Sequence, residues 1–112
     1  MEKINKKVKK YEQIIIELLE KHQFSATEDQ LVIDKKNHHY QLLYIGADNR
    51  NCYLSKIQLH FHLREDGIIC IFENRTEEEV VDTLMLQGVP KSDILVGFLP
   101  QSARKYAGYA VA

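Results

Sequence analysis

The chain has 112 residues, of which 45% are hydrophobic and 28% are charged, as in one ordinary globular domain spanning residues 1–112. Its formal net charge is −1 and its isoelectric point is about 6.5, so the molecule as a whole does not attract DNA or anionic membranes electrostatically. No apolar run approaches the roughly 20 residues of a spanning helix, and the charged N-terminus differs from a signal peptide.

The first 22 residues predict an amphipathic helix. Apolar positions recur there at alternating spacings of four and three, which places them on one helical stripe. The stripe consists of Ile4, Val8, Tyr11, Ile15, Leu18 and His22. The start of the helix is strongly basic, which indicates either a solvated helix end or a surface for DNA phosphates. The candidate nucleic-acid contacts are Lys3, Lys6, Lys7 and Lys10.

Four strand-like runs follow the helix, at residues 31–33, 39–45, 53–63 and 68–72. The third run alternates well, with Ile57, Leu59, Phe61 and Leu63 on one face. The fourth is continuously apolar, as in a central strand covered on both faces. Because turn residues separate neighbouring runs at short intervals, we expect an antiparallel meander.

His60 and His62 lie two residues apart, so a strand places both imidazoles on its polar face. A two-residue turn at Asp66-Gly67 sets His62 opposite Ile71 and His60 opposite Glu73. A three-residue loop from Glu65 shifts the register by one and sets His62 opposite Cys70 and His60 opposite Phe72. Only the second register brings a third soft ligand close. A zinc site needs three or four ligands and nothing in the sequence forces the other histidines toward His60, so an ordinary polar strand face is favoured over a metal-dependent enzyme. We therefore expect no metal or other cofactor.

A second helix is expected to open at Thr76, because Thr76-Glu77-Glu78-Glu79 matches a capping box. Its apolar stripe is Val80, Val81, Leu84 and Met85, and Gly88 with Pro90 predicts its end. The apolar residues 92–99 predict a helical turn. We expect a loop over residues 100–104 and a last strand over residues 106–111.

The sequence offers few candidate catalytic residues. None of the four serines lies in a nucleophile elbow, and no glycine-rich phosphate loop is present. The two cysteines, Cys52 and Cys70, lack a CxxC spacing, so we expect buried, reduced thiols in a cytoplasmic protein. The six tyrosines suit either the edge of the core or a sheet surface that packs on a partner.

The C-terminal part carries a resemblance to a known family. The run GVPKSDILVGF at residues 88–98, followed by Pro100, Arg104 and GYAVA at 108–112, resembles the ending of the XisI family, the fdxN element excision controlling factors. Tyr11 and the other motifs that precede residue 88 also fall in the order and spacing of that family. The signature positions are Tyr40, Gly46, Asp66, Gly67, Thr76, Glu77, Gly88, Val89, Pro90, Ile94, Phe98, Pro100, Arg104 and Tyr109.

This chain departs from the family at three places. Ala47 stands where the family usually carries a tryptophan, and Cys70-Ile71-Phe72 lacks the second one. Asn74-Arg75 replaces an Asp-Gly pair. These changes leave the expected fold intact and concern the partner surface.

The resemblance implies an α+β fold in which a long N-terminal helix and a second helix pack on an antiparallel meander of four to five strands. It also implies an accessory protein without catalytic residues, acting with an XisH-like partner in controlling site-specific DNA excision. Any contact with DNA would be indirect or weak. Apolar sheet edges additionally predict partner docking or a homo-oligomer.

Overall fold

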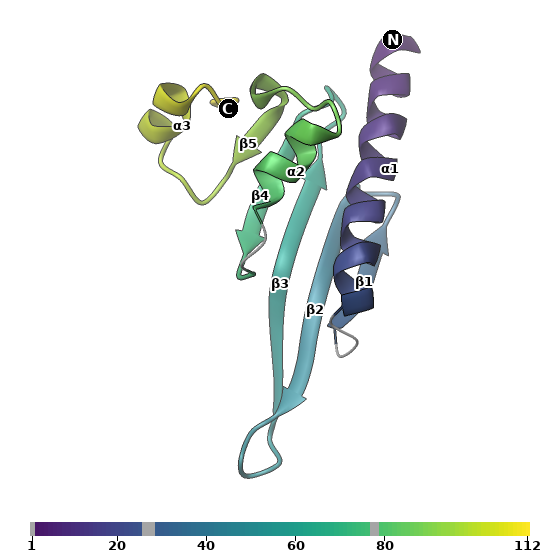
Figure 1. Cartoon of the computed structure of the whole chain (residues 1–112), viewed down its shortest axis with the longest axis vertical. Helices are drawn as coiled ribbons and strands as arrows, with labels where there is room; N and C mark the ends of the chain where they lie inside the picture. Colours follow the sequence, from purple (N-terminus) through teal and green to yellow (C-terminus); the bar gives the residue numbers. More distant parts are fainter. Residues whose placement is uncertain (1, 26–28, 77–78) are drawn as a thin grey trace.

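A computed structural model describes residues 2–25, 29–76 and 79–112, and shows helices packed on one five-stranded sheet (Figure 1). The strand order is β1-β2-β3-β4-β5; β1 to β4 form an antiparallel meander, and β5 runs parallel to β4. The expected α+β fold is confirmed. The elements in chain order are α1 (Glu2–Ser25), β1 (Asp29–Asp34), β2 (His39–Ala47), β3 (Tyr53–Leu63), β4 (Ile69–Asn74), α2 (Val80–Leu86), the 3-10 helix η1 (Lys91–Asp93), β5 (Ile94–Val96) and α3 (Gln101–Ala107).

Helix α1 buries one stripe against the sheet, as the spacing predicts. Tyr11, Ile15 and Leu19 follow one another at intervals of four and are almost wholly buried. Among the described residues, no helix combines the length and the apolar character needed to cross a membrane. Packing on the sheet accounts for the apolar stripe of α1, because Tyr11, Ile15 and Leu19 belong to the buried core.

The core lies between α1, α2 and one face of the sheet, which we call the inner face. On β3, Leu59, Phe61 and Leu63 are buried and the intervening histidines are half-buried, so the predicted alternation is confirmed there. Ile57 was predicted on the same face. It instead pairs with Leu43 beyond a β-bulge and stays exposed, because the bulge shifts the alternation.

The β3–β4 hairpin combines the two registers that the sequence allows. His62 lies opposite Cys70, as a three-residue loop requires, whereas His60 lies opposite Glu73, as a two-residue turn requires. The pairing of β3 with β4 has a bulge between His60 and Phe61, which accounts for the difference. The bulge leaves Phe72 on β4 without a residue directly opposite it on β3. β4 was expected to be covered on both faces, but Phe72 is 41% exposed.

Helix α2 begins at Val80, four residues after the predicted start. Thr76 instead donates from its backbone N–H and its hydroxyl to the side-chain oxygen of Asn74, at 3.0 and 2.7 Å. Glu79 is the N-cap residue and makes no side-chain capping bond, and Glu77 lies outside the described residues. The predicted end is confirmed, because Gly88 follows the helix with φ +97°.

The C-terminal elements differ from those predicted. The helical turn predicted over residues 92–99 is confirmed only at 92–93, within η1, and residues 94–96 form a parallel strand instead. Residues 101–107 form helix α3 rather than a loop and the start of a strand. Residues 108–112 run beside β5, where the Ala110 N–H donates to the Ile94 oxygen at 2.9 Å. Pairing of β5 with β4 is a non-local contact, which periodicity over three apolar residues does not reveal.

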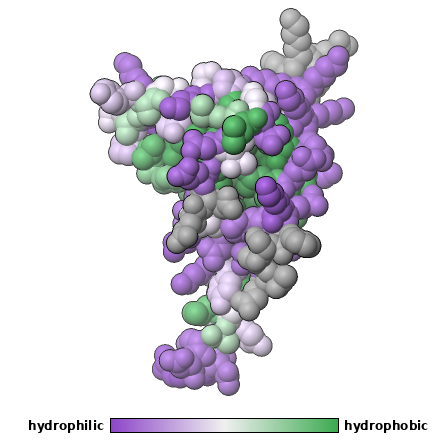
Figure 2. All heavy atoms as spheres, in the orientation of Figure 1, coloured by the Kyte–Doolittle hydropathy of each residue, from purple (hydrophilic) through white to green (hydrophobic). Residues whose placement is uncertain are grey.

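Strands β2 and β3 extend well past their neighbours and give the molecule dimensions of 50 × 31 × 24 Å (Figure 1). We call residues 45–57 the arm. Figure 2 shows the arm projecting from the body, with a hydrophilic tip and apolar side chains above it. The tip is a defined turn, in which the Asp48 carboxylate accepts from the N–H groups of Arg50 and Cys52.

Candidate functional site

Histidines from two strands meet on the outer face of the sheet, opposite the helices. His39 on β2 pairs with His62 on β3, and their rings stack with centroids 4.3 Å apart. His39 Nδ1 lies 3.0 Å from His60 Nε2, so one nitrogen donates and the other accepts. The rings of His60 and Phe72 pack in an edge-to-face arrangement, with their centroids 5.3 Å apart. The third member of this cluster, His39, was not assigned to it from the sequence.

Burial is the main cause of the shifted titration in this cluster. It lowers the pKa of His60, and the neighbouring His39 and His62 lower it further. Burial likewise lowers the pKa of His62, whose Nδ1–H donates to the His38 oxygen at 3.0 Å. Both shifts favour the neutral imidazole, and the hydrogen bond between His39 and His60 needs a lone pair on one of its two nitrogens.

The described residues contain no group of three or more His, Cys, Asp or Glu side chains arranged to hold a metal ion. Cys70 lies opposite His62 in the pairing, but its thiol is buried and burial raises its pKa. A thiol must lose its proton to become a good metal ligand, and burial opposes that loss. Cys52 is also a free thiol and is exposed, so the expectation of burial is wrong for it.

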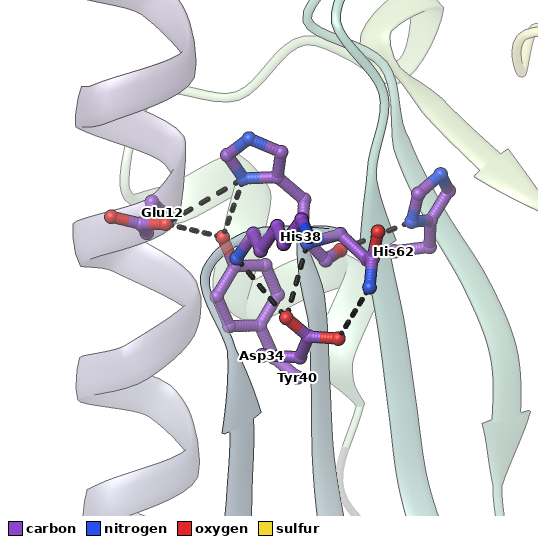
Figure 3. A network of polar contacts seen from close by, with 7 residues as sticks. Glu12, Asp34, His38, Tyr40 and His62 are labelled. Atoms are coloured by element: carbon purple, nitrogen blue, oxygen red, sulfur yellow. Dashed lines mark hydrogen bonds and ion pairs between the residues drawn. The ribbon is translucent and has the colours of Figure 1, made fainter.

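A second polar network joins α1 to β2 on the inner side of the turn after β1 (Figure 3). The Tyr40 hydroxyl donates a very short hydrogen bond to Glu12 Oε2. Because the hydroxyl has only one hydrogen and donates it to Glu12, it accepts from His38 Nδ1–H at 3.1 Å. Burial, then the bond to Glu12, raises the pKa of Tyr40. Tyr40 therefore remains a protonated donor and is poorly suited to act as a base.

The turn itself is held by Asp34 (Figure 3). Its carboxylate accepts from the N–H groups of Lys36 and Asn37, both at 3.1 Å, and from Asn37 Nδ2 at 2.8 Å. The bonds from Asn37 lower the pKa of Asp34. His38 follows with φ +57°, a conformation that its bond to Tyr40 and its carbonyl bonds to β3 compensate.

An open hollow of about 530 Å³ lies beside this network. Its lining mixes charges of both signs, and Arg64 is already paired with Asp66 at 2.5 Å. A hollow of this kind can accept a polar loop or small ligand, but the described residues of its lining include no serine, threonine or cysteine that could serve as a nucleophile. The residues around it are Lys36, Asn37, His38, His62, Leu63, Arg64, Glu65 and Asp66.

One of the candidate nucleic-acid lysines has a structural partner. Lys7 Nζ lies 2.9 Å from Asp93 and 5.7 Å above the Tyr11 ring, whose hydroxyl donates to Asp93 at 2.6 Å. This cluster ties α1 to η1. Lys6 and Lys10 are exposed, and the side chain of Lys3 lies outside what the structure describes. The proposed contact of these lysines with DNA stays a prediction.

Several of the described signature positions serve the fold. Tyr40, Val89 and Ile94 are buried in the core, and Gly67 and Gly88 hold positive φ at turns. Arg104 donates to the Leu99 oxygen at 2.7 Å and twice to the Val111 oxygen, at 2.8 and 3.1 Å. Phe98 is exposed at the surface. Arg104 therefore clamps the C-terminal tail, a role that no local pattern indicated.

Solved structures share this architecture of helices on one face of a five-stranded sheet. The crystal structure of a XisI-like protein from Anabaena variabilis ATCC 29413 has a TM-score of 0.85 and 28% identity, over 94% of this chain and 99% of the other. The fdxN element excision controlling factor XisI from the same organism has a TM-score of 0.80 and 29% identity, over 95% and 99%. No curated protein matches the sequence.

The fold is thus that of the XisI-like α+β proteins. A family model described as XisI protein matches residues 2–111. The chain belongs to the XisI family, which is not a family of known enzymes.

Proposed function

We propose that this chain is a non-catalytic accessory factor that controls excision of a DNA element by binding an XisH-like partner protein. The observation that carries the proposal is the match of residues 2–111 to the XisI family. It is supported by the likeness, over 95% of this chain, to a protein named as an excision controlling factor. In this function the chain contacts DNA indirectly or weakly, and the recombinase is a separate protein.

The chemistry of the described polar groups supports a binding role. Glu12, Tyr40 and His38 bond one another, and Lys7, Tyr11 and Asp93 form a second closed cluster. Groups that satisfy each other rigidify a surface, whereas catalysis needs a nucleophile or base aimed at substrate. The two free thiols fit a reducing, cytoplasmic setting.

Co-purification tests the proposal. An affinity-tagged XisH-like protein from the same source is co-expressed with the untagged chain, and a tagged, unrelated acidic protein serves as the control bait. We expect a stoichiometric complex that survives gel filtration at 150 and 500 mM salt, and no recovery with the control bait. Recovery of the XisH-like protein alone, with both proteins soluble, would contradict the proposal.

A gel-shift titration separates this function from direct binding of DNA. The chain alone, with net charge −1, is expected not to retard duplex DNA at 50 mM salt. Retardation that weakens with salt and is lost in the Lys6→Ala/Lys10→Ala double variant would favour direct contact through the exposed lysines of α1 instead.

A further inference from the structure

The arm is a two-stranded ribbon that stands alone. Pairing of β1 with β2 ends at Tyr44, and pairing of β4 with β3 ends at Leu59, beyond which the Arg75 N–H still donates to the Gln58 oxygen. Within the part of the chain that the structure describes, no strand lies beside β3 at residues 53–57. This edge therefore has backbone groups available for pairing with another strand.

The arm carries large apolar side chains of the kind that is usually covered, yet they are exposed. Every residue from 49 to 57 is exposed, including Tyr53 at 85%, Leu54 at 38% and Ile57 at 37%. On the partner strand, Ile45 is also exposed. An isolated hairpin is at best marginally stable in water, and its apolar side chains gain nothing from burial until a third layer or strand meets them.

The chain also exposes more surface than a compact monomer. A protein of 13.1 kDa is expected to expose about 6,400 Å², whereas this chain exposes 7550 Å². The radius of gyration is 14.9 Å, against about 13 Å for a compact domain of this length. The excess, about 1,100 Å² over the whole chain, accompanies the elongated shape of the molecule, and a standard interface takes roughly 800 Å² from each partner.

We infer that a second copy of this chain docks on the arm, and that the free β3 edges of the two copies pair antiparallel about a two-fold axis. A two-fold contact uses the same patch on both copies, so one arm supplies both halves of the interface. The continuous sheet that results gives each arm a third strand and covers the exposed apolar side chains.

The register that suits this pairing centres on Ser55. Tyr53 then faces Ile57 of the other copy, which is a favourable aromatic and β-branched pair on one face of the sheet. Lys56 faces Leu54, so the two lysines avoid each other. A register centred on Lys56 would set the two ammonium groups directly opposite, which disfavours it.

Sedimentation velocity on the chain alone tests this inference. We expect a mass near twice 13.1 kDa for the wild type at 100 μM. Tyr53→Glu should weaken the association at least tenfold. Tyr106→Glu is the matched control, since Tyr106 is 95% exposed on α3 and should leave the dimer unchanged. Circular dichroism establishes that both variants are folded.

A cross-link tests the paired edge itself. In a Cys52→Ser background, Ser55→Cys is expected to form an intermolecular disulfide on mild oxidation, while Ser102→Cys on α3 is not. A wild type that sediments as a monomer would overturn the inference. So would a dimer that Tyr53→Glu leaves intact, or one without the Ser55→Cys cross-link. Because the chain is tested alone, these outcomes are independent of binding to an XisH-like protein.

Discussion

The arm continues two strands of the body, β2 and β3, yet the two regions differ in what covers these strands. In the body, Leu59, Phe61 and Leu63 are buried beneath α1 and α2. A few residues away on β3, Tyr53 and Ile57 are four residues apart, and so lie on one face of the strand, yet both are exposed. The difference teaches that period-two patterning specifies a strand, whereas burial depends on whether a second layer reaches it.

The comparison predicts that stability lies in the body. Phe61→Ala removes a fully buried ring from beneath the helices and leaves a cavity. We expect it to lower the free energy of unfolding by about 3–5 kcal/mol. Urea denaturation followed by circular dichroism measures the change. A loss below about 1 kcal/mol would show that the body is no better packed than the arm.

The C-terminal clamp is expected to be the next largest contribution. Arg104→Ala removes three charge-assisted bonds to the Leu99 and Val111 oxygens and should cost about 2 kcal/mol. Lys105→Ala, on the same helix but exposed, is the control and should change stability by less than about 0.5 kcal/mol. Equal effects of the two variants in thermal unfolding would argue against a clamp.

The histidine cluster on the outer face of the body should be sensitive to pH. The usual pKa of histidine is about 6.5, and folding holds the pKa of His60 below that value. As pH falls, His60 therefore takes up its proton in the unfolded chain before it does so in the folded chain. The contribution is fully present above about pH 6.5 and is lost as pH falls through the lower, folded pKa. His39, His62 and Glu73 face this group.

The measurement is the free energy of unfolding at pH 7.5 and at pH 5.5. We expect the decrease to be smaller in His60→Gln than in the wild type, because the variant has no imidazole to protonate at this position. Identical decreases in the two proteins would remove His60 from the explanation and leave His62 and the carboxylates as the cause.

The smallest change in stability is expected in the arm. Tyr53→Ala, measured at a concentration where the chain is monomeric, should alter the free energy of unfolding by no more than about 0.5 kcal/mol. Its ring is 85% exposed and leaves no cavity. A loss comparable to that of Phe61→Ala would mean that the arm is part of the core in solution.

Local patterns predicted the first four strands, α1 and the end of α2, because apolar runs and the turn residues that bound them are properties of short segments. The start of α2 was misplaced, since Thr76 bonds Asn74 rather than beginning the helix. β5 and α3 were missed because the strand is three residues long and depends on β4 for pairing. A contact between distant segments leaves no local periodicity.

The candidate site shows the same division. His60 and His62 were identified from their spacing, but His39, Glu12 and Asp93 were not, since they come from other elements. The sequence by itself determined the α+β class, the meander and the stripe of α1, because side-chain periodicity is a local property. Only the tertiary structure decided the bulge that sets the histidine register, the polar clusters that join α1 to the sheet, and the uncovered arm. Each depends on which segments meet in space.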